Sequence, residues 1–196
     1  NAHDLAVQLL QEMSPEERVG QLFITTFKGN DLSESSSINT LISDYYIGGV
    51  ILRVSNDNFI NSNTNQPMDT AEVLEQNRTI QEIKWRATLQ SQTNAAGNTQ
   101  GQPSFIPLWV GVAQNAERQP FDQTIPGMTH LPNPMAIGAT WNPQLSEQVG
   151  AILGEEMSNL GFNFLIGPSL DVLEARLIES TGNRGTRSFG GDPYWV

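Results

Sequence analysis

Residues 143–172, PQLSEQVGAILGEEMSNLGFNFLIGPSLDV, decide the fold. Asn142 stands just before Pro143, and this pair favours a helix start, because the first helical position needs no backbone N–H. Apolar residues then recur at helical spacing as far as Leu160, and Gly161 ends the helix. The apolar run over residues 162–172 predicts a strand that ends in polar residues. This stretch is therefore predicted to be a helix, a glycine and a strand.

The same unit occurs twice earlier in the chain. A predicted helix over residues 38–46 is followed by two glycines and a buried strand over residues 50–54. A longer helix over residues 71–89 is followed by a polar, glycine-containing loop and an apolar strand over residues 105–113. Strands that are joined by crossover helices pair in parallel. The pattern predicts an α/β fold.

The N-terminal region is predicted to be helical before the first strand. Residues 4–13 place apolar side chains at helical spacing, and Ser14-Pro15-Glu16-Glu17 begins a second helix with a serine cap and acidic residues in its first turn. A short β-branched run, GQLFITTF at residues 20–27, follows as a strand.

Two polar loops are longer than simple connections need to be, over residues 55–69 and 115–134. In α/β folds such insertions gather at the carboxyl ends of the strands, where binding sites are built. The alternative interpretation, a surface loop without function, stays open for both and is stronger for the first.

Charge and composition exclude several classes of function. The 196 residues carry a formal charge of −11, which repels nucleic acids and anionic membranes. No apolar run approaches the roughly 20 residues of a transmembrane helix, and no signal-peptide pattern opens the sequence. The chain has no cysteine, so disulfides and thiol chemistry are excluded. Few lysines and many amide side chains favour an exported bacterial protein, extracellular or in the cell envelope, with the cytoplasm left open.

Motifs for metal, nucleotide or triad chemistry are missing from the sequence. The HExxH, EF-hand and phosphate-loop patterns do not occur, so we expect no metal and no cofactor. His3 lies in a predicted terminal helix and His130 in a proline-rich loop, and neither has a patterned partner. A surface or packing role is the better interpretation for both.

Candidate binding residues are the polar side chains at or just beyond the predicted strand ends, namely Arg53, Gln114, Asp171, Arg184 and Arg187. An arginine side chain offers a rigid fork of donors that can hold two adjacent hydroxyls or a carboxylate. Aromatic residues of the same loops could present ring faces to a sugar: Phe121, Trp141 and Phe189. The alternative for Arg187 is a structural salt bridge with Asp171 or Asp192.

Several segments together resemble the N-terminal (β/α)8 barrel of glycoside hydrolase family 3, most closely its β-N-acetylhexosaminidase branch. The segments are MSPEERVGQLFI (13–24), IGGVIL (47–52), LPNPMAIGATWNPQLSEQVGAILGEE (131–156), GEEMSNLGFNFLIGPSLDV (154–172) and RGTRSFGGDP (184–193). They follow the order of the family along nearly the whole chain, and the R-S-F-G-x-D-P element is specific.

The resemblance implies that residues 1–196 are about the first two thirds of a barrel, truncated before its catalytic residues. A helix that begins at Asp192 and Pro193 would then pack outside the barrel. The later strands of the family supply a Lys-His pair, a general acid/base histidine and an aspartate nucleophile, and none of these lies in this chain. We therefore expect the parent protein to be a retaining glycoside hydrolase, a carbohydrate-metabolism enzyme, and this chain alone to be inactive.

The resemblance also implies site residues and one departure from the family. Arg187 matches the arginine that binds the sugar beside the scissile bond, and Asp171 matches a strand-end aspartate that shapes the pocket. The family reads D-Q-E-G-G-x-V after the third strand, whereas this chain reads AQNAERQPF over residues 113–121. Ala113 therefore replaces a sugar-binding aspartate, a loss of about 3 kcal/mol or a hundredfold in affinity, unless Glu117 or Asp122 reaches back into the pocket.

Three functions stay open at this point. The first is the sugar-binding part of a hydrolase acting on a β-linked glucoside or N-acetylglucosaminide. The second, favoured by Ala113, is a non-catalytic carbohydrate-binding or scaffold domain of a larger cell-envelope protein. The third is an interaction module unrelated to sugars, which only the acidic surface supports. An incomplete barrel leaves strand edges and apolar faces unpaired, so we also expect a homodimer.

Overall fold

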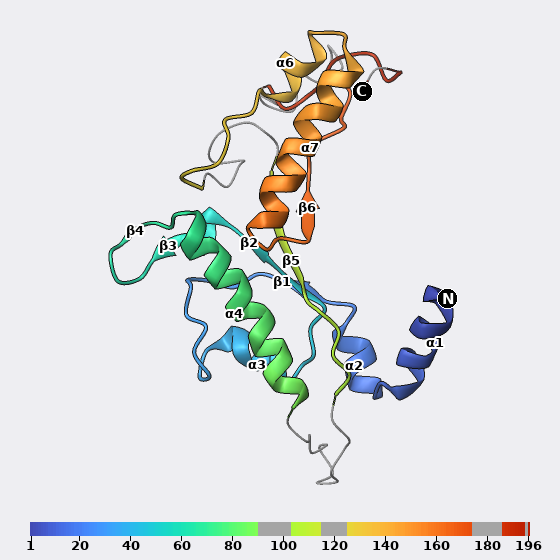
Figure 1. The fold of residues 1–196 in the computed structure, drawn as a ribbon, viewed down its shortest axis with the longest axis vertical. Coiled ribbons are helices and arrows are strands. Elements are labelled where there is room, and N and C mark those ends of the chain that lie inside the picture. The colour runs from blue at the N-terminus through green and yellow to red at the C-terminus, as the bar shows by residue number, and fades with distance from the viewer. Residues whose placement is uncertain (90–102, 115–124, 174–185, 195) are drawn as a thin grey trace.

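The computed structural model describes residues 1–89, 103–114, 125–173, 186–194 and 196 (Figure 1). The helices are α1 (Ala2–Glu12), α2 (Pro15–Gly20), α3 (Ser37–Ser43), α4 (Thr70–Thr88), α6 (Pro134–Gly138) and α7 (Pro143–Asn159), with a 3-10 turn at Val54–Asn56. The strands are β1 (Ile24–Thr25), β2 (Gly49–Leu52), β3 (Ile60–Asn61), β4 (Gln66–Pro67), β5 (Trp109–Ala113) and β6 (Phe164–Ile166).

Four strands form one parallel sheet in the order β1-β2-β5-β6. The register pairs Ile24 with Gly49, Gly49 with Trp109, and Gly111 with Phe164. Each connection between neighbouring strands carries at least one helix, as parallel pairing requires. The predicted α/β fold with a parallel sheet is therefore confirmed, and the described strands do not close into a ring.

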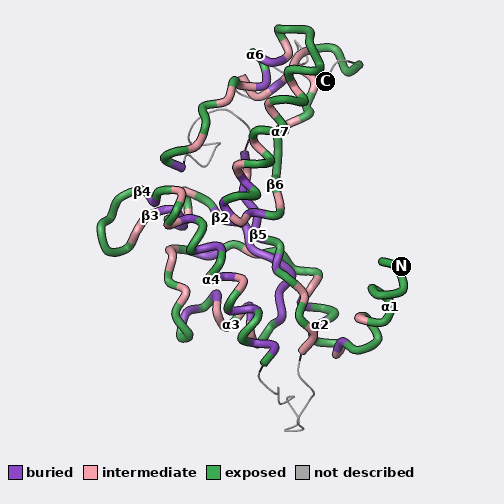
Figure 2. The backbone as a smooth tube through the Cα atoms, in the orientation of Figure 1, coloured by how far each residue is buried: buried purple, intermediate pink, exposed green. Residues whose placement is uncertain are grey.

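The hydrophobic core lies between one face of this sheet and the helices. The side chains on this face are fully buried and pack in one cluster with α3 and α4; they are Val50, Leu52, Val110 and Val112. Those helices contribute apolar residues to the same cluster, as does the C-terminal part of α7: Ile38, Ile42, Val73, Ile80, Ile83 and Met157. Figure 2 shows the buried positions concentrated in β2, β5 and the helix faces turned toward them.

Helices α2 and α7 begin at the residues that the sequence predicts, and α4 begins one residue earlier, because polar side chains cap their first N–H groups. The Ser14 hydroxyl accepts a hydrogen bond from the Glu17 N–H at 3.1 Å, and Asp69 caps α4 in the same way at 2.9 Å. The Asn142 side chain accepts from the Gln144 N–H at 3.1 Å at the start of α7. At the other end of α7, Gly161 takes the left-handed φ of +83° that a helix-ending glycine allows.

Strand lengths and two short elements differ from the sequence-based prediction. β6 covers three residues of the predicted 162–172, and the chain then passes through a cis Gly167–Pro168 bond. The predicted strand over residues 105–113 begins only at Trp109. Helix α6 lies inside the second long loop, and a β3–β4 hairpin lies inside the first. Neither was predicted, because both are too short to show a periodic pattern.

The hairpin is held by a buried asparagine as well as by the apolar packing of Phe59 and Met68. Asn58 is fully buried, and its side chain donates to the Phe27 and Gly29 carbonyls at 3.1 and 2.6 Å. Its side-chain oxygen accepts from the Arg53 N–H at 2.9 Å. The two donated bonds tie the segment after β2 to the segment after β1, and the third orders the segment after β2 itself. The first long loop is thus an ordered structure at the carboxyl ends of two strands.

A buried lysine lies at the opposite, amino-terminal end of the sheet. Lys84 of α4 is 3% exposed, and its ammonium group lies 5.8 Å from the centre of the Tyr46 ring. Burial lowers the pKa of Lys84, and the charge of Glu17 opposes that shift. Burial raises the pKa of Tyr46, with a smaller contribution from Glu17. The cluster joins α2, the segment after α3, and α4 at a point where burial disfavours charge.

Candidate functional site

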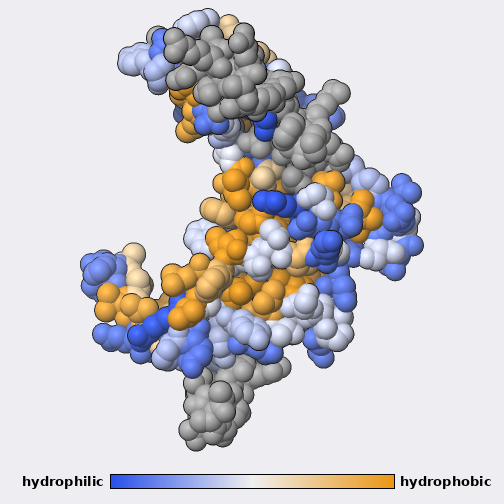
Figure 3. All heavy atoms as spheres, turned by 180° about the vertical axis from the view of Figure 1, so that it is seen from behind, coloured by the Kyte–Doolittle hydropathy of each residue, from blue (hydrophilic) through white to orange (hydrophobic). Residues whose placement is uncertain are grey.

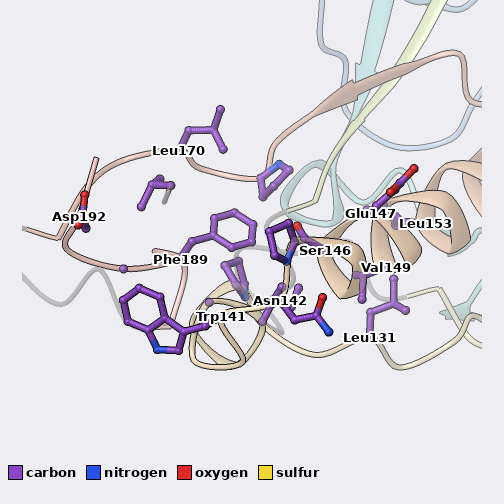
Figure 4. A pocket seen from close by; sticks show the side chains of 18 of the residues that line it. Leu131, Trp141, Asn142, Ser146, Glu147, Val149, Leu153, Leu170, Phe189 and Asp192 are labelled. Carbon is purple, nitrogen blue, oxygen red and sulfur yellow. The ribbon is translucent and has the colours of Figure 1, made fainter. Parts of the chain in front are cut away.

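A pocket of about 570 Å³ lies beyond the carboxyl ends of β5 and β6. Gln114 follows β5 directly, and Pro168 and Leu170 follow β6, so both strand ends contribute to its floor. Helices α6 and α7 form one wall and residues 189–192 form another (Figure 4). Ligand sites of parallel α/β proteins occur at this end of the sheet, because loops and helix N-termini meet there.

The pocket is mostly apolar, with two aromatic residues. Trp141 is 68% exposed and takes a φ of +52°, a left-handed turn between α6 and α7 that is uncommon for a bulky residue. Phe189 lies on the facing turn (Figure 4). Leu131, Val149 and Leu153 extend the apolar lining. Such surfaces suit a ligand that has both an apolar face and hydroxyl groups.

Polar groups are few and lie around this apolar surface. Figure 4 shows Asp192 and Glu147 toward opposite ends of the pocket, and both are exposed. Asn142 and Ser146 line the wall formed by α7 and its cap, and Gln114, which is 7% exposed, lines the strand side. Carboxylates and amides at these places can accept hydrogen bonds from a polyol.

Ser188 holds the turn that forms one wall of the pocket. It is 2% exposed, and its hydroxyl lies 2.9 Å from the Asp171 carbonyl and 3.0 Å from the Gly190 carbonyl. The Leu173 N–H donates to the same Gly190 carbonyl at 2.9 Å. Segments 171–173 and 188–190 therefore lie side by side, although they are far apart in sequence.

Helix α6 holds the same turn from the other side. The Met135 N–H donates to the Thr186 carbonyl at 3.1 Å. Gly138 lies so close to Phe189 that an added Cβ would come within 1.8 Å of its carbonyl oxygen. Only glycine fits such an approach, so the position of Phe189 depends on the small residue that faces it.

The structure brings some of the predicted site residues together and separates others. Gln114, Trp141 and Phe189 line the pocket. Arg187 is half-buried and Asp171 is exposed, and neither lines the pocket, although the Ser188 bond joins their segments beside it. Arg53 is exposed at the end of β2, in the neighbourhood of the hairpin. The remaining predicted residues lie outside the described part of the chain: Glu117, Phe121, Asp122 and Arg184.

Asp192 caps a turn at the position where the sequence predicts the start of a helix. Its side chain accepts from the Tyr194 N–H at 2.9 Å, and its carbonyl accepts from the Val196 N–H at 3.2 Å. The capping role derived from the sequence is thus present, and the spacing of the second bond is that of one helical turn. Asp192 also lines the pocket, which the capping argument did not foresee.

Ala113 is the last residue of β5, and the register pairs it with Ile166. It is half-buried, one residue before pocket-lining Gln114. The position at which the motif match predicts a replaced aspartate therefore lies at the carboxyl end of a strand, next to the pocket-lining Gln114. A methyl group there cannot accept a hydrogen bond.

Sequence reasoning missed several residues that shape the site. Ser188, Gly138 and Glu147 carry no pattern of their own, since serine, glycine and glutamate are common in loops and helices. The one available signal for Ser188 was its place inside the R-S-F-G element. Both histidines are exposed, and the described residues contain no group of three acidic or histidine side chains that could hold a metal ion. No described helix combines the length and the apolar composition needed to cross a membrane.

A parallel α/β sheet with a pocket beyond its strand ends defines a class in which ligands bind at that edge. In sequence comparison, residues 14–196 match the family described as "Glycosyl hydrolase family 3 N terminal domain". The chain belongs to glycosyl hydrolase family 3, which confirms the resemblance found in its motifs.

The relatives include both glucosidases and N-acetylglucosaminidases. Beta-glucosidase 2 of Saccharomycopsis fibuligera is 38% identical over 66 residues, which cover 34% of this chain and 7% of that enzyme. A family 3 β-N-acetylglucosaminidase from Paenibacillus sp. str. FPU-7 superposes with a TM-score of 0.67 at 24% identity, over 93% of this chain and 28% of that one. NagZ of Neisseria gonorrhoeae gives a TM-score of 0.57 at 22% identity, over 88% and 42%. The two structural likenesses show a shared fold, and this chain spans less than half the length of each of these three relatives.

Proposed function

We propose that this chain is the sugar-binding part of a retaining glycoside hydrolase that acts on a β-linked glucoside or N-acetylglucosaminide. One observation carries the proposal: a partly aromatic pocket lies at the carboxyl ends of β5 and β6, and the family's R-S-F-G-x-D-P element forms one of its walls. Glycosidase names among the relatives support the same reaction class.

The same proposal includes the architecture, a partial (β/α)8 barrel. Support comes from four parallel strands in chain order, with α3 and α4 packed on one face only. A complete barrel has eight such strands surrounded by helices. The described strands amount to half of that number, where sequence similarity predicted about two thirds.

The proposed binding mode uses aromatic faces and one guanidinium. A pyranose ring would lie against Trp141 or Phe189, because its axial C–H groups form an apolar face. Arg187 would donate to sugar hydroxyls from the rim, with Asp171 shaping the same region, since the Ser188 bond joins their segments. This assignment rests on the match to the family motif and on that proximity.

Catalysis would need groups from outside this chain. A retaining glycosidase uses a nucleophile and a general acid/base. The resemblance to the family implies that an aspartate nucleophile and a histidine acid/base lie in later segments, so we expect no turnover of a chromogenic N-acetylglucosaminide or glucoside by the purified 196-residue chain. Measurable turnover that survives repurification would contradict this expectation.

The binding proposal is tested by calorimetric titration with N-acetylglucosamine and glucose. We expect Arg187→Ala to weaken binding about tenfold or more, because a charged hydrogen-bond donor is lost. Arg78→Ala is the matched control, since Arg78 lies on α4 in an exposed pair with Glu75 at 3.5 Å. Equal affinities for all three proteins would remove the role assigned to Arg187.

A second function is favoured by Ala113. With a methyl group at the strand-end position, the chain could bind a sugar without supporting its hydrolysis, as a non-catalytic carbohydrate-binding or scaffold domain of an extracellular or cell-envelope protein. One experiment separates the two functions. A parent protein that binds sugar but does not hydrolyse it would support the second function, provided that its Ala113→Asp variant gains turnover.

A further inference from the structure

Two basic residues lie side by side at the carboxyl ends of β1 and β2. The register pairs Thr25 with Val50, so Lys28, at the bend after β1, reaches the level of Arg53. One buried amide group also joins them: the Asn58 side chain donates to the carbonyls on either side of Lys28 and accepts from the Arg53 N–H at 2.9 Å. Both basic residues are exposed. The fold therefore fixes two cationic side chains next to each other.

The Arg53 side chain belongs to the face of the sheet that is turned away from the hydrophobic core. Its backbone is extended, with φ −140° and ψ 140°. Side chains alternate along such a backbone, so Arg53 shares a face with Ile51, while Leu52 between them is fully buried in the core. Figure 3 shows the molecule from behind, where apolar residues gather across the middle and hydrophilic residues lie beside them toward the hairpin.

The neighbouring strand places a methyl group at the same level. The β2–β5 register ends with the pair Leu52–Val112. The residues that follow, Arg53 and Ala113, are therefore adjacent, on strands that lie about 4.8 Å apart. Across the sheet this level holds two cations and no acid, namely Lys28, Arg53, Ala113 and Ile166. An alanine beside Arg53 leaves the guanidinium without an acidic neighbour on the next strand.

Acidic residues of the described chain do not neutralise this pair of cations. The two arginines of α4 each pair with a glutamate of the same helix, at 3.5 and 3.2 Å. By contrast, Lys28 and Arg53 form no ion pair with any described residue. The carboxylates nearest to them in sequence are Asp31, which accepts from a backbone N–H at 2.9 Å, and the exposed Asp57. Two unpaired cations at one place, in a chain with 21 acidic and 10 basic residues, favour an anionic ligand.

We propose that Lys28 and Arg53 form an anion-binding site, and that the sugar recognised at this edge of the sheet carries an oxyanion, a carboxylate or a sulfate ester. The guanidinium holds two oxygens of the anion in its planar fork, and the ammonium group adds a further donor. Gln114, which follows Ala113, lines the pocket, so the anion site and the pocket adjoin at the end of β5. The anion site rests on the contacts above, and its use for a sugar rests on the proposed function.

Ala113 determines specificity in this arrangement. An aspartate at position 113 would pair with Arg53, occupy its donors and place a negative charge where the anion binds. The alanine leaves the guanidinium free and offers no acceptor to the hydroxyl groups of a neutral sugar. The residue at position 113 therefore sets the preference between neutral and anionic sugars, and Ala113→Asp should shift it toward neutral ones.

The first test is calorimetric titration of the purified chain with two charged sugars, glucuronate and N-acetylglucosamine 6-sulfate, with their neutral counterparts, and with inorganic sulfate. We expect one charged sugar to bind at least about tenfold more tightly than its neutral counterpart and than sulfate, and that sugar identifies the oxyanion. Arg53→Gln should weaken its binding about tenfold or more and Lys28→Gln about threefold, with neutral sugars unaffected. Arg78→Gln, exposed on α4, is the matched control and should change nothing. Unchanged far-UV circular dichroism shows that each variant folds.

The second test is the same titration of Ala113→Asp, which should bind the charged sugar about tenfold or more weakly, because the new carboxylate pairs with Arg53. An unchanged affinity in this variant would show that the two positions do not share a site, and would overturn the inference.

The titrations distinguish failure of the inference from failure of the proposed function. Neutral sugars that bind as tightly as charged ones, or binding that Arg53→Gln leaves unchanged, would overturn the inference and leave the proposed function standing. Inorganic sulfate that binds as tightly as the charged sugars would reveal an adventitious anion site and would also overturn it. Binding of a charged sugar that depends on Arg53 supports the inference even if neutral sugars do not bind. No binding of any probe would contradict both.

Discussion

Ser188→Ala should loosen the wall of the pocket that carries Arg187 and Phe189. The hydroxyl has one proton, which it can donate to the Asp171 carbonyl at 2.9 Å or the Gly190 carbonyl at 3.0 Å, and its oxygen also lies 3.3 Å from the Gly190 N–H. The side chain is 2% exposed, so alanine leaves polar groups in a place with little water. We expect the free energy of opening this turn to fall by about 2 kcal/mol.

Hydrogen exchange at the Leu173 amide measures that opening directly. This N–H donates to the Gly190 carbonyl at 2.9 Å and exchanges when the two segments separate. A loss of about 2 kcal/mol corresponds to roughly thirtyfold faster exchange. Ser146→Ala, on the α7 wall of the same pocket, is the control and should leave Leu173 unchanged. Exchange within twofold of the parent chain in Ser188→Ala would refute the reasoning.

Three further predictions concern stability and binding. Asn58→Ala should lower the free energy of unfolding by about 3 kcal/mol, because three hydrogen bonds of a fully buried amide are lost. Asn63→Ala on the exposed hairpin tip is the control and should lower it by less than about 0.5 kcal/mol. Urea denaturation measures both changes. Lys84→Met should raise stability at pH 7 by about 1 kcal/mol. Because burial lowers the pKa of Lys84, the unfolded chain holds more protons between that lowered pKa and 10.5, so the parent chain should gain stability as pH rises through this window, and the methionine variant should not. Denaturation at pH values below 10 keeps Tyr46, whose raised pKa acts in the opposite direction above 10, from contributing. Ala113→Asp should tighten N-acetylglucosamine binding up to about a hundredfold if the pocket is a sugar site, and calorimetry showing no gain would count against that use of the strand end.

Local sequence patterns determined the longer helices and the parallel pairing of the strands. The serine cap of α2 and the asparagine cap of α7 lie where expected, because a cap depends only on residues within one turn. The helix–glycine–strand units predicted parallel pairing, because a helix between two strands carries the chain back across the sheet, so that both strands run in the same direction. The motif order also sufficed for the family, which the match over residues 14–196 confirms.

Tertiary structure decided which residues meet. The Ser188 hydroxyl finds the Asp171 carbonyl across 17 positions, and Gly138 faces the Phe189 backbone across a longer separation. Such contacts depend on how whole elements pack, and no periodicity in the sequence records them. The sheet is a case of the same kind: its apolar strands are typical of a sheet that is covered on both faces, and only the folded arrangement shows that the described helices pack on one of them.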